Sequence, residues 1–181
     1  RLPPLEHPTN FIDEKFEAEM SKYFRDVARD VLAEFDKDAD KLKRYTPTTK
    51  AVADDFLAGW FDVTKWNGEL PKRAEPFVRR TMISGGEKTL KRIAAQEFDP
   101  LNSRVLTALS KHRNTRLRSV NSRAKKRLRR TLAAGLEEGE GAAALRKRLQ
   151  SEFKNMEAST ATMIARTESI WAFNEGAVQA Y

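Results

Sequence analysis

The chain has 181 residues, a net charge of +8, and compositions of 33% charged and 40% hydrophobic residues. It contains no cysteine, which excludes disulfides, thiolate metal sites and thiol catalysis. Its two histidines, His7 and His112, are far apart in sequence, so we predict neither a metal site nor any other cofactor. No apolar run is long enough to span a membrane, and the opening residues RLPPLEHP lack the apolar core of a signal peptide. Because the sequence begins without methionine, we expect the chain to be a fragment of a longer protein.

The N-terminal half is predicted to be helical after a short arm. Residues 1–12 contain three prolines and no periodicity, which predicts an extended arm that becomes ordered when it docks. Residues 13–43 have the 3.6-residue periodicity of a long amphipathic helix. Its apolar stripe consists of Phe16, Met20, Tyr23, Val27, Val31, Phe35 and Leu42.

Proline, glycine and capping residues set the next predicted boundaries. Thr46 and Pro47 end the first helix, and Thr48 or Thr49 can cap a second helix that extends to Trp60. Residues 61–71 are predicted to be a connector with Phe61 and Trp66 as aromatic anchors. We expect Pro71 in the first turn of a third helix, an interruption at Gly85 and Gly86, and a short helix to about Gln96.

The C-terminal half has similar helical signals. In FDPLN, residues 98–102, Asp99 can cap a helix and Pro100 can occupy its first position. Residues 119–138 are predicted to form a helix, 139–141 a turn, and the remainder two helices, to about 153 and from about 158. The apolar stripe of the 119–138 helix consists of Val120, Ala124, Leu128, Leu132 and Leu136.

These patterns predict an all-α fold, an elongated bundle of long helices with short loops. Alternation of β-branched residues is nearly absent, so no strand is predicted. We divide the chain into the arm at 1–12, an N-terminal helical region at 13–97, and a second helical domain at 98–181.

The positive charge is concentrated in one stretch. Residues 101–130 contain eleven Lys and Arg residues and no Asp or Glu. On a helix, Arg123, Lys126, Arg127 and Arg130 share a face opposite the leucine stripe, and the preponderance of arginine favours bidentate phosphate contacts. An acidic protein partner or a merely solvated face would explain the charge as well. The residues predicted to bind nucleic acid are Arg113, Arg116, Arg118, Arg123, Lys126, Arg127 and Arg130.

Catalytic motifs are not evident. The segment SGGEKT, residues 84–89, lacks the spacing of a phosphate-binding P-loop, and there is no G-x-S-x-G nucleophile elbow. The carboxylates at 36–40 and at 54–55 lie among lysines or on amphipathic helices, which is typical of solvated faces rather than of two-metal catalysis. We therefore predict a protein that is not an enzyme.

The segment IARTESIWAFNEG, residues 164–176, places polar residues inside an otherwise apolar helix. Arg166 and Glu168 point to different sides of such a helix, so each needs a partner on another element. Buried polar groups without partners are costly, which favours a role in docking this helix. We assign Arg166, Thr167, Glu168 and Asn174 to a structural docking network, with Gly176 as the last residue of the motif.

This segment resembles the signature of the Mu F-like minor head proteins of tailed phages, also called the phage head morphogenesis family. The shared pattern is IARTES followed by Asn-x-Gly, and upstream GLEEG (135–139), LRKRLQSEF, RSVNSRAKKRL, FDPLNSRVL and a double glycine also resemble that family. The resemblance is firm over about 98–181 and looser over 60–97. The chain departs from the pattern at Gly141, where a serine is common, and at Thr160, where an arginine is common.

The resemblance implies a virion component that associates with the portal protein during head assembly and remains inside the capsid near the portal vertex. It implies contact with packaged double-stranded DNA, a stage in the host cytoplasm during assembly, and scaffold or major capsid protein as further candidate partners. Family members usually continue with a small β-containing segment. Two alternatives are a generic helical nucleic-acid-binding protein and the non-catalytic part of a virion-packaged enzyme.

Overall fold

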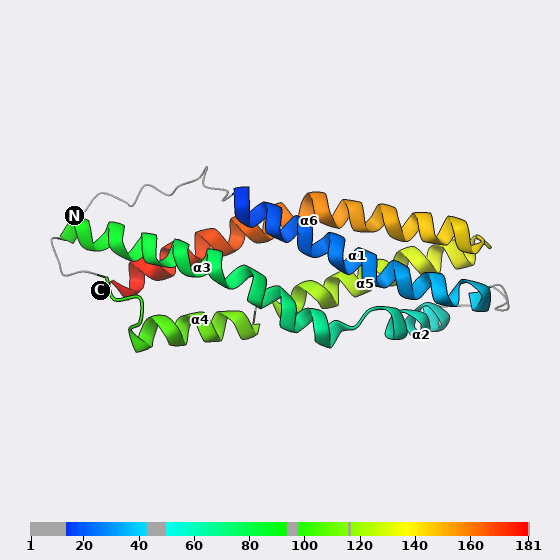
Figure 1. The fold of residues 1–181 in the computed structure, drawn as a ribbon, viewed down its shortest axis with the longest axis horizontal. Coiled ribbons are helices and arrows are strands. Elements are labelled where there is room, and N and C mark those ends of the chain that lie inside the picture. Colours follow the sequence, from blue (N-terminus) through cyan, green and yellow to red (C-terminus); the bar gives the residue numbers. More distant parts are fainter. Residues whose placement is uncertain (1–13, 43–49, 94–97, 116, 181) are drawn as a thin grey trace.

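The described part of the chain forms an elongated all-α bundle, as the sequence predicts (Figure 1). The computed structural model describes residues 14–42, 50–93, 98–115 and 117–180. The predicted extended arm, the caps at Thr48 and Thr49, and the segment around Gln96 lie outside these residues. The helices are α1 (Glu14–Leu42), α2 (Lys50–Trp60), α3 (Val63–Ile93), α4 (Ser103–Thr115), α5 (Arg118–Glu137) and α6 (Ala142–Gln179).

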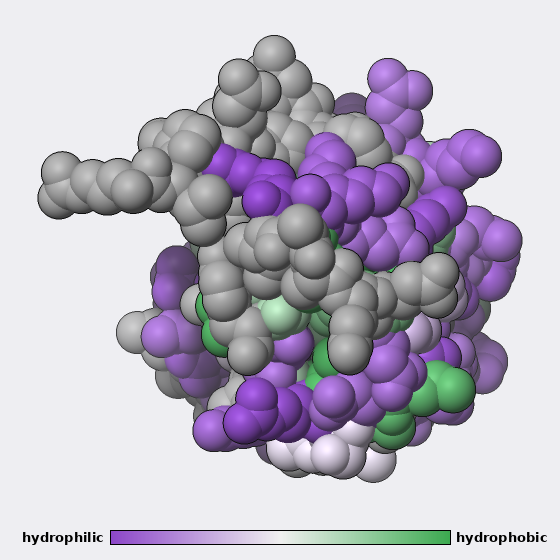
Figure 2. All heavy atoms as spheres, turned by 90° about the vertical axis from the view of Figure 1, so that its left-hand side faces the viewer, coloured by the Kyte–Doolittle hydropathy of each residue, from purple (hydrophilic) through white to green (hydrophobic). Residues whose placement is uncertain are grey.

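The longest helix, α6, runs along most of the bundle and contacts helices at both ends (Figure 1). At one end it lies beside α1 and α5, and at the other beside the second half of α3 and α4. One hydrophobic core connects all six helices and crosses from the N-terminal helical region into residues 98–181. Viewed from the end where α3 and α6 finish, mostly hydrophilic side chains cover the described surface, with hydrophobic ones in small patches (Figure 2).

The apolar stripe of α1 supplies much of this core. All seven of its predicted members are buried. Aromatic pairs continue the stripe into neighbouring helices, with Phe16 stacked on Phe77 at a centroid distance of 4.8 Å and Tyr23 edge-on to Trp66 at 5.4 Å. The prediction that Trp66 is an aromatic anchor is therefore confirmed. Such large buried side chains contribute roughly 2–3 kcal/mol each through the hydrophobic effect.

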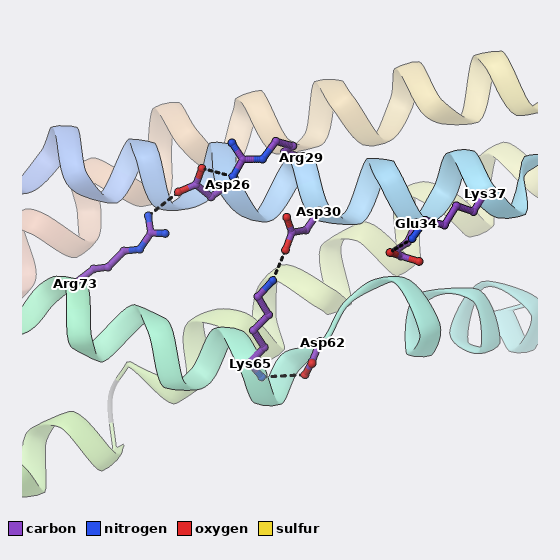
Figure 3. Close-up of polar contacts among 8 residues, drawn as sticks. All are labelled: Asp26, Arg29, Asp30, Glu34, Lys37, Asp62, Lys65 and Arg73. Carbon is purple, nitrogen blue, oxygen red and sulfur yellow. Dashed lines mark hydrogen bonds and ion pairs between the residues drawn. The ribbon is translucent and has the colours of Figure 1, made fainter.

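The third helix begins earlier than predicted. We expected a connector at 61–71 and a helix start at Pro71, but α3 begins at Val63 and includes Pro71 in its interior. The cap is Asp62, whose Oδ1 accepts a hydrogen bond from the backbone N–H of Lys65 at 2.9 Å (Figure 3). This is the geometry of an N-cap residue, so the capping signal at Asp62 was present in the sequence.

Helix α4 also begins elsewhere than predicted. We expected Asp99 to cap it, but the Oδ1 of Asn102 accepts the bond from the N–H of Arg104 at 2.9 Å, and the helix begins at Ser103. Asp99 instead accepts a bond from the N–H of Leu101 at 2.9 Å in the preceding turn. Asp99 therefore stabilises the turn before the helix, and Asn102 caps the helix itself.

The predicted turn at 139–141 is confirmed. After α5, Gly139 has φ = +72°, a conformation that favours glycine. The N–H of Glu140 donates to the carbonyl of Gly135 at 2.9 Å, and that of Gly139 to the carbonyl of Leu136 at 3.1 Å. These two bonds form a Schellman motif, which satisfies carbonyls at the end of α5 and turns the chain back into α6.

Two predicted interruptions do not occur. Helix α3 continues through Gly85 and Gly86, and α6 is one helix where two were predicted around residues 153–158. Gly85 and Gly176 lie where α3 and α6 cross. A Cβ atom added to Gly85 would lie 2.1 Å from the carbonyl oxygen of Phe173, and one added to Gly176 would lie 1.9 Å from that of Met82. The two helices therefore meet backbone to backbone, and both glycines are required for packing.

Ion pairs connect α1 to α3 along the side of the bundle (Figure 3). Arg73 on α3 contacts Asp26 on α1 at 2.8 Å, and Lys65 on α3 pairs with Asp30 on α1. Partial burial raises the pKa of Asp26, but the hydrogen bond and charge of Arg73 outweigh this effect and lower the pKa below its ordinary 3.8. The ionised carboxylate is therefore the form that the folded protein stabilises.

We predict that Gly176→Ala destabilises the protein by about 1–3 kcal/mol or more, because its Cβ would overlap the backbone of α3. Gly68→Ala in α3 is the matched control, since nothing lies within 4 Å of a Cβ there. The control should be neutral or stabilising by about 0.5–1 kcal/mol because alanine favours the helix. Urea unfolding monitored by circular dichroism measures both, and equal free energies of unfolding for the two variants contradict the crossing.

We predict that Asp26→Asn weakens the dependence of stability on acid. Because the folded-state pKa is depressed, the carboxylate stabilises the fold above about pH 4, and this contribution is lost as pH falls through the folded-state pKa. Wild type should therefore exceed the variant in free energy of unfolding at pH 6 and approach it at pH 2.5. Asp55→Asn, at an exposed position on α2, is the control. A loss for Asp26→Asn that is the same at both pH values is the contrary result.

Candidate functional site

A series of cations lies along one face of α5. Arg123, Lys126 and Arg130 are exposed and are spaced by three and four residues, so they share one side of the helix. Arg123 bonds within its own helix, with its Nη2 donating to Ser119 Oγ at 3.0 Å. In the part of the chain that the structure describes, none of the three pairs with a carboxylate. We name these three residues the basic strip.

The neighbouring arginines of α5 are neutralised. Arg127 donates to Glu152 on α6 at 2.6 Å and is half-buried, and Arg129 contacts Asp54 on α2 at 3.0 Å. These pairs join α5 to the helices on either side. Arg127, which we predicted to bind nucleic acid, therefore has an intramolecular partner that Arg123, Lys126 and Arg130 lack. The side chains of Arg113, Arg116 and Arg118, also predicted to bind, lie outside the described residues.

A buried polar network fixes the inner face of α5 beneath this surface. The hydroxyl of Tyr23 on α1 donates to Asn121 Oδ1 at 2.6 Å, and Asn121 Nδ2 donates to Asn67 Oδ1 on α3 at 3.0 Å. Asn121 is 1% exposed. Burial raises the pKa of the Tyr23 phenol, so the hydroxyl stays protonated and acts as a donor. A satisfied network of this kind favours one rotational setting of α5, with the basic strip outward.

The IARTES motif is divided between two faces of α6. Glu168 and Gly176 are buried, whereas Arg166, Thr167 and Asn174 are exposed. We assigned Arg166, Thr167, Glu168 and Asn174 to one docking network. The structure brings only Glu168 of these four into a buried polar contact, while Gly176 forms the close crossing with α3.

The partner of Glu168 is His112, at the end of the described side chains of α4. The carboxylate Oε2 and the imidazole Nε2 are hydrogen-bonded, and both side chains are buried. Trp171, one turn after Glu168, stacks on the His112 ring with a centroid distance of 3.4 Å and an interplanar angle of 6°. The pair and the stacked ring attach α4 to α6.

Sequence reasoning missed this contact because the two residues are 56 positions apart. A weak signal existed, since His112 follows Val105 and Leu109 at helical spacing and so continues an apolar face. Of the α4 side chains that the structure describes, Val105 and His112 are the buried ones. The helix is therefore held by few side chains, and the buried pair is a large part of its attachment.

Other site classes gain no support from the geometry. Within the described residues, no group of three or more His, Cys, Asp or Glu side chains could hold a metal ion. None of the described helices is long and apolar enough to cross a membrane.

No protein-family model, curated protein or solved structure matches the chain. The resemblance to phage head morphogenesis proteins therefore depends on the residue patterns alone.

We predict that Glu168→Ala destabilises the protein far more than Glu137→Ala. Removing Glu168 leaves a buried imidazole without its hydrogen-bond partner, at a cost of about 1–3 kcal/mol. Glu137 is exposed at the end of α5, where a substitution should change stability by no more than about 0.5 kcal/mol. Thermal unfolding of both variants measures the difference.

A double-mutant cycle with His112→Ala separates the pair from simple loss of packing. If the two residues interact, the double variant should lose much less stability than the sum of the single variants. Equal melting temperatures for Glu168→Ala and Glu137→Ala, or strictly additive losses in the cycle, are incompatible with a stabilising pair.

Proposed function

We propose that this protein is a minor head protein of a tailed phage, a virion component that contacts packaged double-stranded DNA without sequence specificity and associates with the portal protein. The observation that carries the DNA contact is the basic strip, three exposed cations on a helix whose inner arginines are already paired. Exposed cations that have no acidic neighbour are available to phosphates and release counterions when they bind them.

The geometry favours backbone contact over base reading. From Arg123 to Arg130 the strip extends about 10 Å along α5, which allows contact with a few successive phosphates. Serines rather than aromatic residues accompany it on the exposed face of α5, at positions 119 and 122, so stacking on unpaired bases is not favoured. Because α5 is packed against α2 and α6, the cations are presented by a rigid rod rather than by a flexible tail.

The association with the virion and the portal is supported by the resemblance. The structure supplies physical roles for two residues of the family-like motif, since Glu168 attaches α4 and Gly176 permits the crossing with α3. A long, rigid helical protein with a basic surface suits a position beside densely packed DNA. The proposal places the protein inside the capsid near the portal vertex.

We predict that changing Arg123, Lys126 and Arg130 to Gln weakens binding to random-sequence duplex DNA and reduces its salt dependence. The slope of log affinity against log salt concentration should fall by about one unit for each phosphate that the variant no longer neutralises. Fluorescence anisotropy at several salt concentrations measures this slope. Arg127→Gln alone should change the slope less, because Arg127 already pairs with Glu152.

The matched control removes three exposed cations elsewhere, with Lys22, Lys91 and Arg104 changed to Gln. It has the same net charge as the strip variant, so it corrects for overall electrostatic attraction. The same decrease in affinity in both variants would remove the basic strip as the DNA-binding surface. Strip-dependent DNA binding without association with a portal protein co-expressed from the same genome would favour the generic nucleic-acid-binding protein.

A further inference from the structure

A pocket of about 160 Å³ lies between α3 and α4, away from the basic strip. Its volume is close to that of an apolar cavity that holds one benzene ring. Its apolar walls come from both helices and from the residue that precedes α5, and consist of Pro71, Ala74, Val78, Leu106, Leu109 and Leu117.

The polar residues that line the pocket differ in whether they already have an interaction partner. His112 lines it but is already bonded to Glu168, and Glu75 has an interaction of its own. Arg79 is half-buried at the pocket, and within the described residues it has neither an ion pair nor a hydrogen bond. A guanidinium that is partly desolvated and unpaired beside apolar walls attracts an anion more strongly than an exposed one.

We infer that this pocket binds a small carboxylate bearing one aromatic or branched aliphatic group. The apolar group lies against Val78 and Leu109, and Arg79 donates to the carboxylate. A mostly apolar cavity with a few polar groups is the usual composition of a small-molecule site, and of the two charged residues here, Arg79 and Glu75, only Arg79 lacks a partner among the described residues. This site is independent of the DNA contact, because none of its lining residues belongs to the basic strip.

Because the pocket lies between α3 and α4, a bound ligand would affect how α4 is attached to the bundle. Leu106 lines the pocket and is 42% exposed, so a bound ring would cover apolar surface that is now open to water. The ligand would also connect α3 and α4 directly, beside the buried pair that attaches α4 to α6. Binding should therefore stabilise the attachment of α4 as well as fill the pocket.

The test is an amide NMR titration of the full chain with hydrocinnamate, hydrocinnamamide and phenylpropylamine. These probes share one ring and differ in charge. Hydrocinnamate should saturate with a dissociation constant on the order of 1 mM, shift amides of α3 and α4, and bind about tenfold more tightly than the amide. Arg79→Gln should remove that preference, and Arg104→Gln, on the exposed side of α4, should leave it intact.

A second variant tests the cavity itself. Leu109→Trp fills the pocket and should abolish binding of all three probes. If this variant does not fold, the comparison of Arg79→Gln with Arg104→Gln decides. Equal affinity for the three probes, an unchanged preference in Arg79→Gln, or no saturable binding of hydrocinnamate overturns the inference. None of these outcomes depends on whether the protein binds DNA.

Discussion

The crossing of α3 and α6 is the constraint on which the rest of the arrangement depends. At Gly85 and Gly176 the two backbones are so close that neither position has room for a Cβ atom. This approach sets the distance between the helices, and with it the position of the second half of α6. Glu168 lies about two turns before Gly176, so the same crossing determines where the carboxylate meets His112 of α4. Removing the close approach would therefore displace a buried polar pair as well as a packing surface.

Ion pairs connect the long helix α6 to α1 and α5, so its position affects the rest of the bundle. Arg146 and Glu157 on α6 pair with α1, at 2.7 Å to Asp36 and 2.6 Å to Arg25, and Glu152 pairs with Arg127 of α5. These pairs are largely exposed, so each contributes little to stability. They have a second effect, because they neutralise cations that lie between helices. On α5, the outward side keeps its unpaired cations, and the basic strip is therefore a product of packing as well as of composition.

Local sequence rules predicted the helical faces and the bounds of α1 and α5 well, but they misplaced the starts of α3 and α4 and predicted breaks in α3 and α6 that do not occur. The stripe from Phe16 to Leu42 and the turn at Gly139 follow from periodicity and backbone preference, which act within a few residues. The predicted interruption at Gly85 was wrong because a glycine inside a helix costs only about 1 kcal/mol, which close packing of a partner outweighs. That partner is about 90 residues away in the sequence. The predicted break around residues 153–158 was wrong as well, and the hydroxyls of Ser159 and Thr162 donate to the carbonyls of Asn155 and Ala158 within the continuous helix.

The candidate site shows that local sequence also cannot predict which charged side chains are paired in the fold. Composition identified the basic stretch, but it could not distinguish a free arginine from a paired one. Arg127 and Arg130 differ in pairing, because Glu152 lies opposite the first and, among the described residues, no carboxylate pairs with the second. The partners that neutralise Arg127 and Arg129 are 25 and 75 positions away. Charge density along a sequence therefore gives an upper bound on a phosphate-binding surface. The fold reduces it to the cations that other helices leave unpaired, and those are the cations that we propose to contact phosphates.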